Sequence, residues 1–268
     1  MLVAVPWYTP IDPPADLDGL LACSWTARPT GAHRLTPDGC TDLLRVDGGP
    51  FVLCGPERTS WTFELPPGAT AVGIRFRPGG AHATFGVDVS TIVDERVPLA
   101  ELIGEDAAAV ADATLAAAPT LDDRRGALVG LVGGWTDRTS IDPEAERILD
   151  ILAASPRAGQ RQLADAATLS VRSLRRLSLR QFGYGTSTLA RILRFQRFLA
   201  VASMTLRPTS LAVLAARAGY VDHAHLARDC RAITSLSPTA FLAEYFPTFP
   251  DMADPYKTAS ASWATMAQ

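Results

Sequence analysis

The chain of 268 residues has little lysine, no asparagine, four histidines and four cysteines, and these shortages narrow the functions open to it. Lys257 is the single lysine, so arginine carries almost all of the positive charge. The cysteines show no CxxC spacing, which indicates neither a zinc site nor a disulfide framework. We expect four buried free thiols: Cys23, Cys40, Cys54 and Cys230.

Long apolar runs are absent as well. No run of roughly 18 apolar residues occurs, so we expect no membrane-spanning helix. The N-terminus, MLVAVPWYTP, has an early proline and no basic segment, a pattern unlike a signal peptide. These features predict a cytoplasmic protein. Residues 247–268, ending in ASASWATMAQ, are predicted to form a disordered tail.

Charge is distributed unevenly along the chain, although the net charge is only -3. Residues 150–245 contain 13 arginines and five acids, so this part carries +8 and the rest of the chain -11. For a single helix, a solvated basic face would be the simpler interpretation. Because the excess extends over a whole domain, it predicts that the C-terminal part binds a polyanion.

Short β-type runs separated by turn residues fill much of the first 80 residues. In AVGIRFR (71–77), apolar side chains at Val72, Ile74 and Phe76 alternate with small or basic ones. Several such runs with Pro-Gly or Asp-Gly turns favour an antiparallel β sandwich or small barrel. Alanine-rich helical segments follow between Leu99 and Trp135. We therefore predict an N-terminal β-rich domain with a helical pair over residues 1–138.

Side chains of the types that bind metals occur at four positions of this domain: His33, Asp38, Cys40 and His82. A cupin-like metal site usually needs two or three histidines at strand spacing and a carboxylate. Only two histidines lie in this half, so we predict no metal and no cofactor. Arg75 and Arg77 share a strand face and could hold an anionic ligand, although pairing with nearby acids is the simpler expectation. No nucleophile elbow, phosphate loop or dinucleotide fingerprint is present, and we predict that the chain is not an enzyme.

The stretch from Arg161 to Gln181 predicts a short helix, a turn and a second helix rich in arginine. We expect helices at 160–167 and 171–182, with Ser170 as the N-cap and glycines ending the second. Val171, Leu174 and Leu177 recur at helical spacing, which leaves the arginines on other faces: Arg172, Arg175, Arg176 and Arg180. A helix of this kind, held against a shorter one, can lie in a DNA major groove.

The same pattern recurs after a long connecting helix expected at 187–204. A short helix from Ser210 stops at Gly219, and Asp222 caps the helix HAHLARDCRAIT. The inner stripe of that helix is predicted to be Leu226, Cys230 and Ile233. The two units begin about 48 residues apart, from Gln162 to Ser210. With a helix starting at Asp142-Pro143 and a short one at 239–245, residues 139–246 are predicted to form an all-α domain with two helix-turn-helix units, and the chain an α+β two-domain protein.

The string RAGYVDHAHLARDCRAITSLSPTAFL (217–242) resembles the signature of the AraC/XylS family of bacterial transcription regulators. SVRSLRRLSLRQFGYG (170–185) resembles the family's first unit. Leu226 stands where the family usually has phenylalanine, and Cys230 is also a replacement, but both stay apolar. In the N-terminal half, PDGCTDLL, CGPE and VGIRFRPGG look like the domain attached to many actinobacterial members. The resemblance implies a cupin-like β domain that senses a ligand or mediates dimerisation.

The resemblance also implies which residues face DNA. By motif position the base-facing residues of the first unit are Arg172, Arg175 and Arg176. Those of the second unit are His223, Ala224, Ala227 and Arg228. On the same two helices we predict further DNA contacts from Ser170, Ser173, Arg180 and Arg231. Guanidinium groups suit guanine edges or phosphates, whereas alanine offers only apolar contact, so the first unit should carry most of the readout.

The resulting hypothesis is a one-component, ligand-responsive transcription regulator without catalytic activity. Its two recognition helices would read successive major grooves about 34 Å apart on one duplex. The expected partners are double-stranded DNA, a small-molecule effector, RNA polymerase and a second copy of the chain. The alternative is a cupin-like metal enzyme, or a DNA alkyl-acceptor protein with Cys40 as its reactive thiol, fused to the DNA-binding module.

Overall fold

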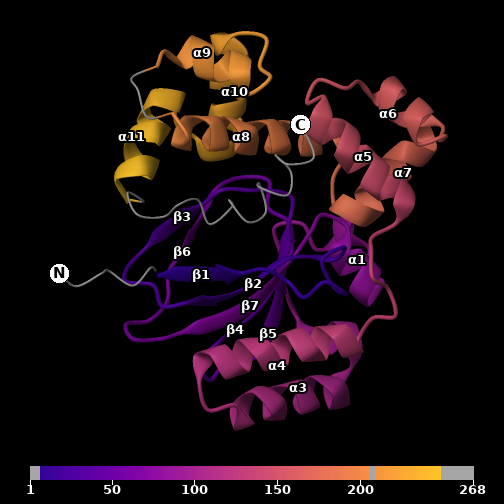
Figure 1. The fold of residues 1–268 in the computed structure, drawn as a ribbon, viewed down its shortest axis with the longest axis vertical. Coiled ribbons are helices and arrows are strands. Elements are labelled where there is room, and N and C mark those ends of the chain that lie inside the picture. Colours follow the sequence, from indigo (N-terminus) through magenta and orange to yellow (C-terminus); the bar gives the residue numbers. More distant parts are fainter. Residues whose placement is uncertain (1–6, 206–208, 249–268) are drawn as a thin grey trace.

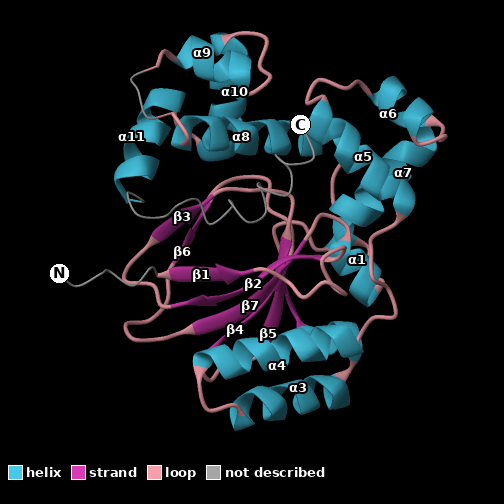
Figure 2. Cartoon of the chain, viewed as in Figure 1, coloured by secondary structure: helices cyan, strands magenta, loops and turns pink. Residues whose placement is uncertain are grey.

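A computed structural model describes residues 7–205 and 209–248 as a β-sheet domain joined to a helical domain (Figure 1). The strands form the centre of the N-terminal part, and helices cover one side of it and build the C-terminal part (Figure 2). The predicted α+β two-domain fold is confirmed. The tail was predicted over residues 247–268, but the last helix runs through Thr248, so the predicted start was wrong. Residues 249–268 lie outside the described part of the chain.

The main sheet has six strands in the order β1-β2-β7-β4-β5-β8, all antiparallel. Its core strand β7 carries the predicted alternation, because Val72, Ile74 and Phe76 are buried on one face while Arg75 points to the other. The strands are β1 (Tyr8–Ile11), β2 (Leu21–Ala27), β4 (Thr41–Val46), β5 (Phe51–Cys54), β7 (Ala71–Phe76) and β8 (Arg96–Pro98).

A second, small sheet lies over the other face of the main sheet. It consists of β3 (His33–Leu35) and β6 (Trp61–Phe63), which pair antiparallel over three residues each. The rings of Trp7, Tyr8 and Trp25 fill the space between the two sheets. The domain is therefore a sandwich, and the main sheet, which ends at β1 and β8 in the described chain, does not close into a barrel.

Helices pack on the face of the main sheet where Val72, Ile74 and Phe76 are buried. α4 (Leu121–Gly134) lies against β2 and β7, and α3 (Glu105–Ala117) packs on α4 (Figure 1). α4 begins with a capping box in which Thr120 and Asp123 exchange hydrogen bonds. This helical pair is the one expected from the alanine-rich sequence. The short elements around it were not expected: α1 (Gly80–Phe85), η1 (Val89–Thr91), β8 and the start of α2 (Leu99–Ile103) as a separate helix.

The C-terminal helices begin at the predicted caps. Asp142 caps α5 with Pro143 at its first position, Ser170 caps α7, and Asp222 caps α10. None of the described helices is long and apolar enough to cross a lipid bilayer. The helices are α5 (Pro143–Ala154), α6 (Gln160–Ala166), α7 (Val171–Phe182), α8 (Thr186–Ser203), α9 (Leu211–Arg217), α10 (His223–Thr234) and α11 (Pro238–Thr248).

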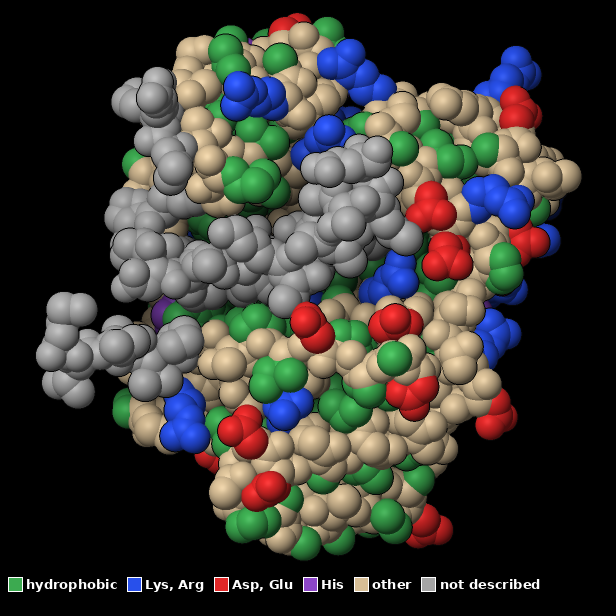
Figure 3. Space-filling view, viewed as in Figure 1, with side chains coloured by type: hydrophobic (Ala, Val, Ile, Leu, Met, Phe, Trp, Pro, Cys, Tyr) green, Lys and Arg blue, Asp and Glu red, His purple; other side chains and the backbone are tan. Residues whose placement is uncertain are grey.

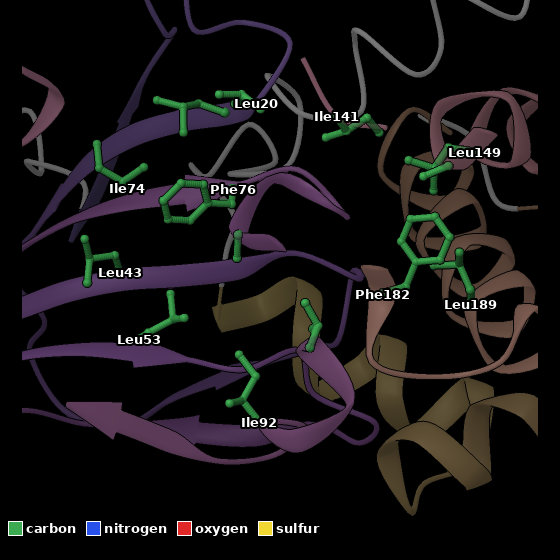
Figure 4. Packing of buried hydrophobic residues seen from close by; sticks show 14 of the residues in the cluster. Leu20, Leu43, Leu53, Ile74, Phe76, Ile92, Ile141, Leu149, Phe182 and Leu189 are labelled. Carbon is green, nitrogen blue, oxygen red and sulfur yellow. The ribbon is translucent and has the colours of Figure 1, made fainter. Parts of the chain in front are cut away.

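One continuous apolar core joins the N-terminal domain to the first helix-turn-helix unit. Leu20, Phe76 and Ile92 of the sheet domain belong to the same buried cluster as Phe182 and Leu189 (Figure 4). Ile141, in the segment between the domains, lies in this cluster as well. The second unit has a separate core around Phe195, Phe198 and Phe241 of the helical domain. The two units are therefore attached to the N-terminal domain by different kinds of contact.

Gly183, which ends α7, lies at the join between the domains. Its φ is +83°, and a Cβ there would come within 2.6 Å of Val93 Cγ2 and 3.0 Å of Pro56 Cγ. We expect Gly183→Ala to lower the free energy of unfolding by about 1–3 kcal/mol, because it adds both backbone strain and a clash. Urea denaturation followed by circular dichroism measures this change.

Gly126→Ala is the matched control. Gly126 is in the middle of α4, where an added Cβ would have nothing within 4 Å. That substitution should raise the stability by up to about 1 kcal/mol, since alanine favours a helix over glycine. If both substitutions change the free energy of unfolding equally little, the contact between the domains does not constrain Gly183.

Candidate DNA-binding surface

The first unit consists of α6, a tight turn and α7. Within the turn, the amide of Leu169 donates to the carbonyl oxygen of Ala164 at 2.8 Å. Thr168 takes the left-handed conformation, with φ +56°, which lets the chain reverse in so few residues. The Ser170 hydroxyl then accepts a hydrogen bond from the Ser173 amide at 3.0 Å and starts α7. Local hydrogen bonds thus set the angle between the two helices.

α7 has one buried and one exposed side. Leu174, Ser178 and Phe182 are buried against the rest of the unit and the N-terminal domain. The predicted arginines are all exposed, and none of them takes part in an ion pair with a described residue: Arg172, Arg175, Arg176 and Arg180. Four unneutralised guanidinium groups on one exposed helix give a surface suited to phosphates and guanine edges.

The second unit repeats the turn of the first. The amide of Tyr220 donates to the carbonyl oxygen of Ala215 at 2.9 Å, the same five-residue closure as in the first unit. Gly219, with φ +88°, occupies the place of Thr168. The two short helices start at Gln160 and Leu211, so the repeat is 51 residues and not about 48. The predicted spacing was short because it was counted from Gln162, which lies inside the first helix, to Ser210, which is the N-cap of the second.

α10 presents a less basic surface than α7. Leu226, Cys230 and Ile233 form the buried stripe, as predicted. His223, Ala224, Arg228 and Arg231 are exposed, whereas Ala227 is only 9% exposed and has little surface to offer to a base. On the face drawn in Figure 3, basic side chains are visible over the α8–α10 part of the molecule.

Arg194 lies on the connecting helix α8, and its charged side chain is buried. It is 8% exposed, and its Nη2 lies 2.7 Å from Oδ2 of Asp229 in α10. Its Nη1 donates to the carbonyl oxygen of Pro156 in the loop before α6 at 3.1 Å. Its guanidinium also stacks over the ring of Tyr220. One side chain therefore connects α8, α10 and the first unit.

Arg157 makes a second connection between the units. Its Nε donates to the carbonyl oxygen of Gly219 at 2.8 Å and its Nη2 to that of Tyr220 at 2.5 Å. Pro156 packs against Gly219 from the same loop. Together with Arg194, these contacts form what we call the clasp: Pro156, Arg157, Arg194, Gly219, Tyr220 and Asp229. No spacing rule in the sequence marks Arg157 or Arg194 as the arginines that join the two units.

His225 sits beside the clasp and not among the exposed positions of α10. Its ring meets the Tyr220 ring edge-on at 5.1 Å, and its Nε2 is 3.6 Å from Asp229. Burial, and after it the charge of Arg194, holds the pKa of His225 below its usual range. The ring is therefore neutral at pH 7, and His223 is the histidine that α10 exposes.

The side chains of the N-terminal domain that could bind a metal do not form a common site in the described part of the chain. His33 stacks on the ring of Trp7, His82 bonds the Val87 carbonyl through Nδ1, and Asp38 pairs with Arg75. No group of three potential ligands forms within the described ranges. Arg75 forms ion pairs with nearby acids, as expected from the sequence. Burial raises the pKa of the Cys40 thiol well above its usual range, so it stays protonated at pH 7.

Comparison with known families agrees with this geometry. A family described as a helix-turn-helix domain matches residues 163–244, which contain both units and α8. Residues 163–244 form an AraC-type helix-turn-helix domain. The AraC-type domain makes the chain a DNA-binding transcription regulator. Residues 9–98 match a domain of unknown function (DUF6597), which is compatible with the cupin-like sandwich.

Similarity of the chain to individual known proteins is low. No curated protein matches the chain. Among solved structures, a variant of apo ToxT from Vibrio cholerae is similar, with 8% identity and a TM-score of 0.42 over 82% of this chain and 95% of that one. At this identity and TM-score, the likeness adds nothing to the assignment.

Removing Arg194 should be costly for the AraC-type domain. We expect Arg194→Met to lower the free energy of unfolding by about 3 kcal/mol, because the buried Asp229 would keep only the longer contacts with His225 at 3.6 Å and Arg191 at 3.8 Å. Urea denaturation provides the measurement. Arg197→Met, at an exposed position of the same helix, is the control and should change stability by no more than about 0.5 kcal/mol.

The double variant Arg194→Met with Asp229→Leu separates charge from packing. It should recover much of the loss, since no buried charge is then left unpaired. Failure to recover any stability would mean that the hydrogen bond to Pro156 and the Tyr220 stacking carry the effect.

Proposed function

We propose that the chain is a one-component regulator in which α7 supplies most of the sequence readout and α10 mostly positions the domain on DNA. This proposal is supported by the exposed arginines of α7, none of which forms an ion pair with a described residue. The second recognition helix, α10, exposes fewer side chains that can donate hydrogen bonds. Base edges are read by donors that can reach into the groove, whereas phosphate contacts fix register. The proposed contacts are those predicted from the sequence, with Ala227 the weakest of them.

We also propose that the N-terminal domain senses a small molecule and that the chain acts in the cytoplasm without catalysing a reaction. The protonated, buried thiols support the last point, because an alkyl-acceptor protein needs a reactive thiolate. Burial raises the pKa of Cys23 to about 11 and that of Cys54 to about 12. It remains a prediction that the chain associates with RNA polymerase and with a second copy of itself.

Two arginines of α7 test the readout. The binding site is first selected from a pool of random duplex DNA, and affinity is then measured by fluorescence anisotropy at fixed salt. Arg175→Ala and Arg176→Ala should each weaken binding by about 1–3 kcal/mol where the side chain contacts a base. A phosphate contact would instead weaken binding to all sequences and lower the salt dependence by about one unit.

Arg138→Ala is the control, since Arg138 is exposed and precedes α5 in the sequence, outside both helix-turn-helix units. It should leave affinity for the selected site unchanged. Unchanged affinity in Arg175→Ala and Arg176→Ala as well would contradict the assignment of α7 as the main reading helix.

A further inference from the structure

The two helix-turn-helix units have separate apolar cores, although α8 runs between them (Figure 1). Leu189 and Ile192 of α8 belong to the cluster that the first unit shares with the sheet domain. Phe195 and Phe198 of the same helix belong to the cluster of the second unit. Arg194 lies at this division. Closely packed side chains hold two parts in one arrangement, so units with separate cores need other contacts to fix the angle between them.

The clasp supplies such contacts. Arg157, in the loop before α6, donates hydrogen bonds to the carbonyl oxygens of Gly219 and Tyr220 at 2.8 Å and 2.5 Å. Its neighbour Pro156 packs against Gly219 and accepts a hydrogen bond from Arg194 at 3.1 Å. The loop that leads into the first unit is thereby bound to the turn of the second unit.

The clasp holds the N-terminal end of α10. Gly219 and Tyr220 lie in the turn before this helix, and Asp222 is its N-cap. A recognition helix in the major groove contacts base edges with its N-terminal residues. A rotation of α10 relative to the first unit must therefore stretch or break the hydrogen bonds of Arg157, at the end of the helix where its angle matters for DNA.

Two half-sites on one duplex are related by a distance and by a rotation. Inserting one base pair between them moves the second half-site by about 3.4 Å and turns it by about 35°. Two recognition helices held at one angle fit one spacing, whereas two helices that can rotate fit several. The resistance of the protein to a new spacing is limited by the free energy of the contacts that must break first.

We propose that Arg157 is a positioning residue that restricts the domain to one spacing of its two half-sites. The proposal rests on the proposed function, in which both units contact the same duplex, and it adds the distance between the half-sites to what the protein recognises. Arg194 acts in the same way, but its side chain is buried against Asp229, so its removal also lowers stability. Arg157 is exposed, so its substitution should loosen the clasp and leave the domain folded.

Spacing is tested with the full chain and the selected DNA, in which the two half-sites are located by footprinting. Fluorescence anisotropy gives the affinity for this site and for versions with one base pair inserted or removed between the half-sites. The unaltered chain should bind the new spacings about tenfold more weakly or worse. In Arg157→Met this loss should shrink to about threefold or less, because two hydrogen bonds no longer resist the new angle.

Arg161→Met is the matched control. Arg161 is exposed, lies four residues further along the chain and makes none of the clasp contacts. This variant should show the same loss on the new spacings as the unaltered chain. An equal loss in Arg157→Met would overturn the proposal, and so would equal affinity of the unaltered chain for all three spacings.

A measurement without DNA separates this proposal from the function on which it rests. Spin labels are attached to cysteines introduced by Asp165→Cys in α6 and Ala232→Cys in α10, at exposed positions, since the four natural cysteines are buried. Double electron–electron resonance should give a narrow distribution of distances between the labels. Arg157→Met should broaden this distribution, and Arg161→Met should not.

The outcomes distinguish the two proposals. Failure to select any DNA would contradict the DNA-binding function while leaving the distance distribution to judge the clasp. A distribution that stays equally narrow in Arg157→Met would overturn the role of Arg157 in fixing the angle between the units.

Discussion

The position of one recognition helix relative to the other depends on the buried guanidinium of Arg194. It joins the connecting helix, the second recognition helix and the loop before the first unit through three kinds of contact at once. Arg157 adds two hydrogen bonds from that loop to the turn of the second unit. Successive major grooves lie at a fixed separation, so a reader with two helices needs such a connection between them.

The N-terminal domain holds the two units in different ways. The first unit and the start of α8 share its apolar core, because Phe182 of α7 and Leu189 of α8 pack among residues of the sheet domain. The second unit contacts it through the ion pair of Glu244 with Arg34 and the hydrogen bond of Ile233 with Ser60. Tyr245 also lines a cavity together with Trp61 and Phe63 of the small sheet. A closely packed apolar core allows little relative movement of the parts that share it. Single polar contacts at the surface can be replaced by contacts with water at a small cost in free energy. The second unit is consequently the one that the N-terminal domain can influence.

Much of the helical domain was predictable from sequence, because its boundaries are local. Ser170 and Asp222 cap the helices at the predicted residues, and Gly183 ends α7 as glycine commonly does. The exposed arginines of α7 followed from the apolar period. Arg194 could not be placed in the same way, since its burial depends on Asp229, which lies 35 residues away and on another helix. The pairing of β3 with β6, and hence the cavity, likewise depends on contacts between distant segments.

The shared apolar core has a consequence for how the chain can be divided. We predicted a domain boundary near residue 138, but the buried Tyr184 of the helical part has its hydroxyl close to the loop that contains Gly39. A fragment that began at α5 would leave Phe182, Tyr184 and Leu189 without the surfaces that cover them in the whole chain. Such a fragment would expose this apolar surface to water, so we expect the first unit and the β sandwich to be stable only together.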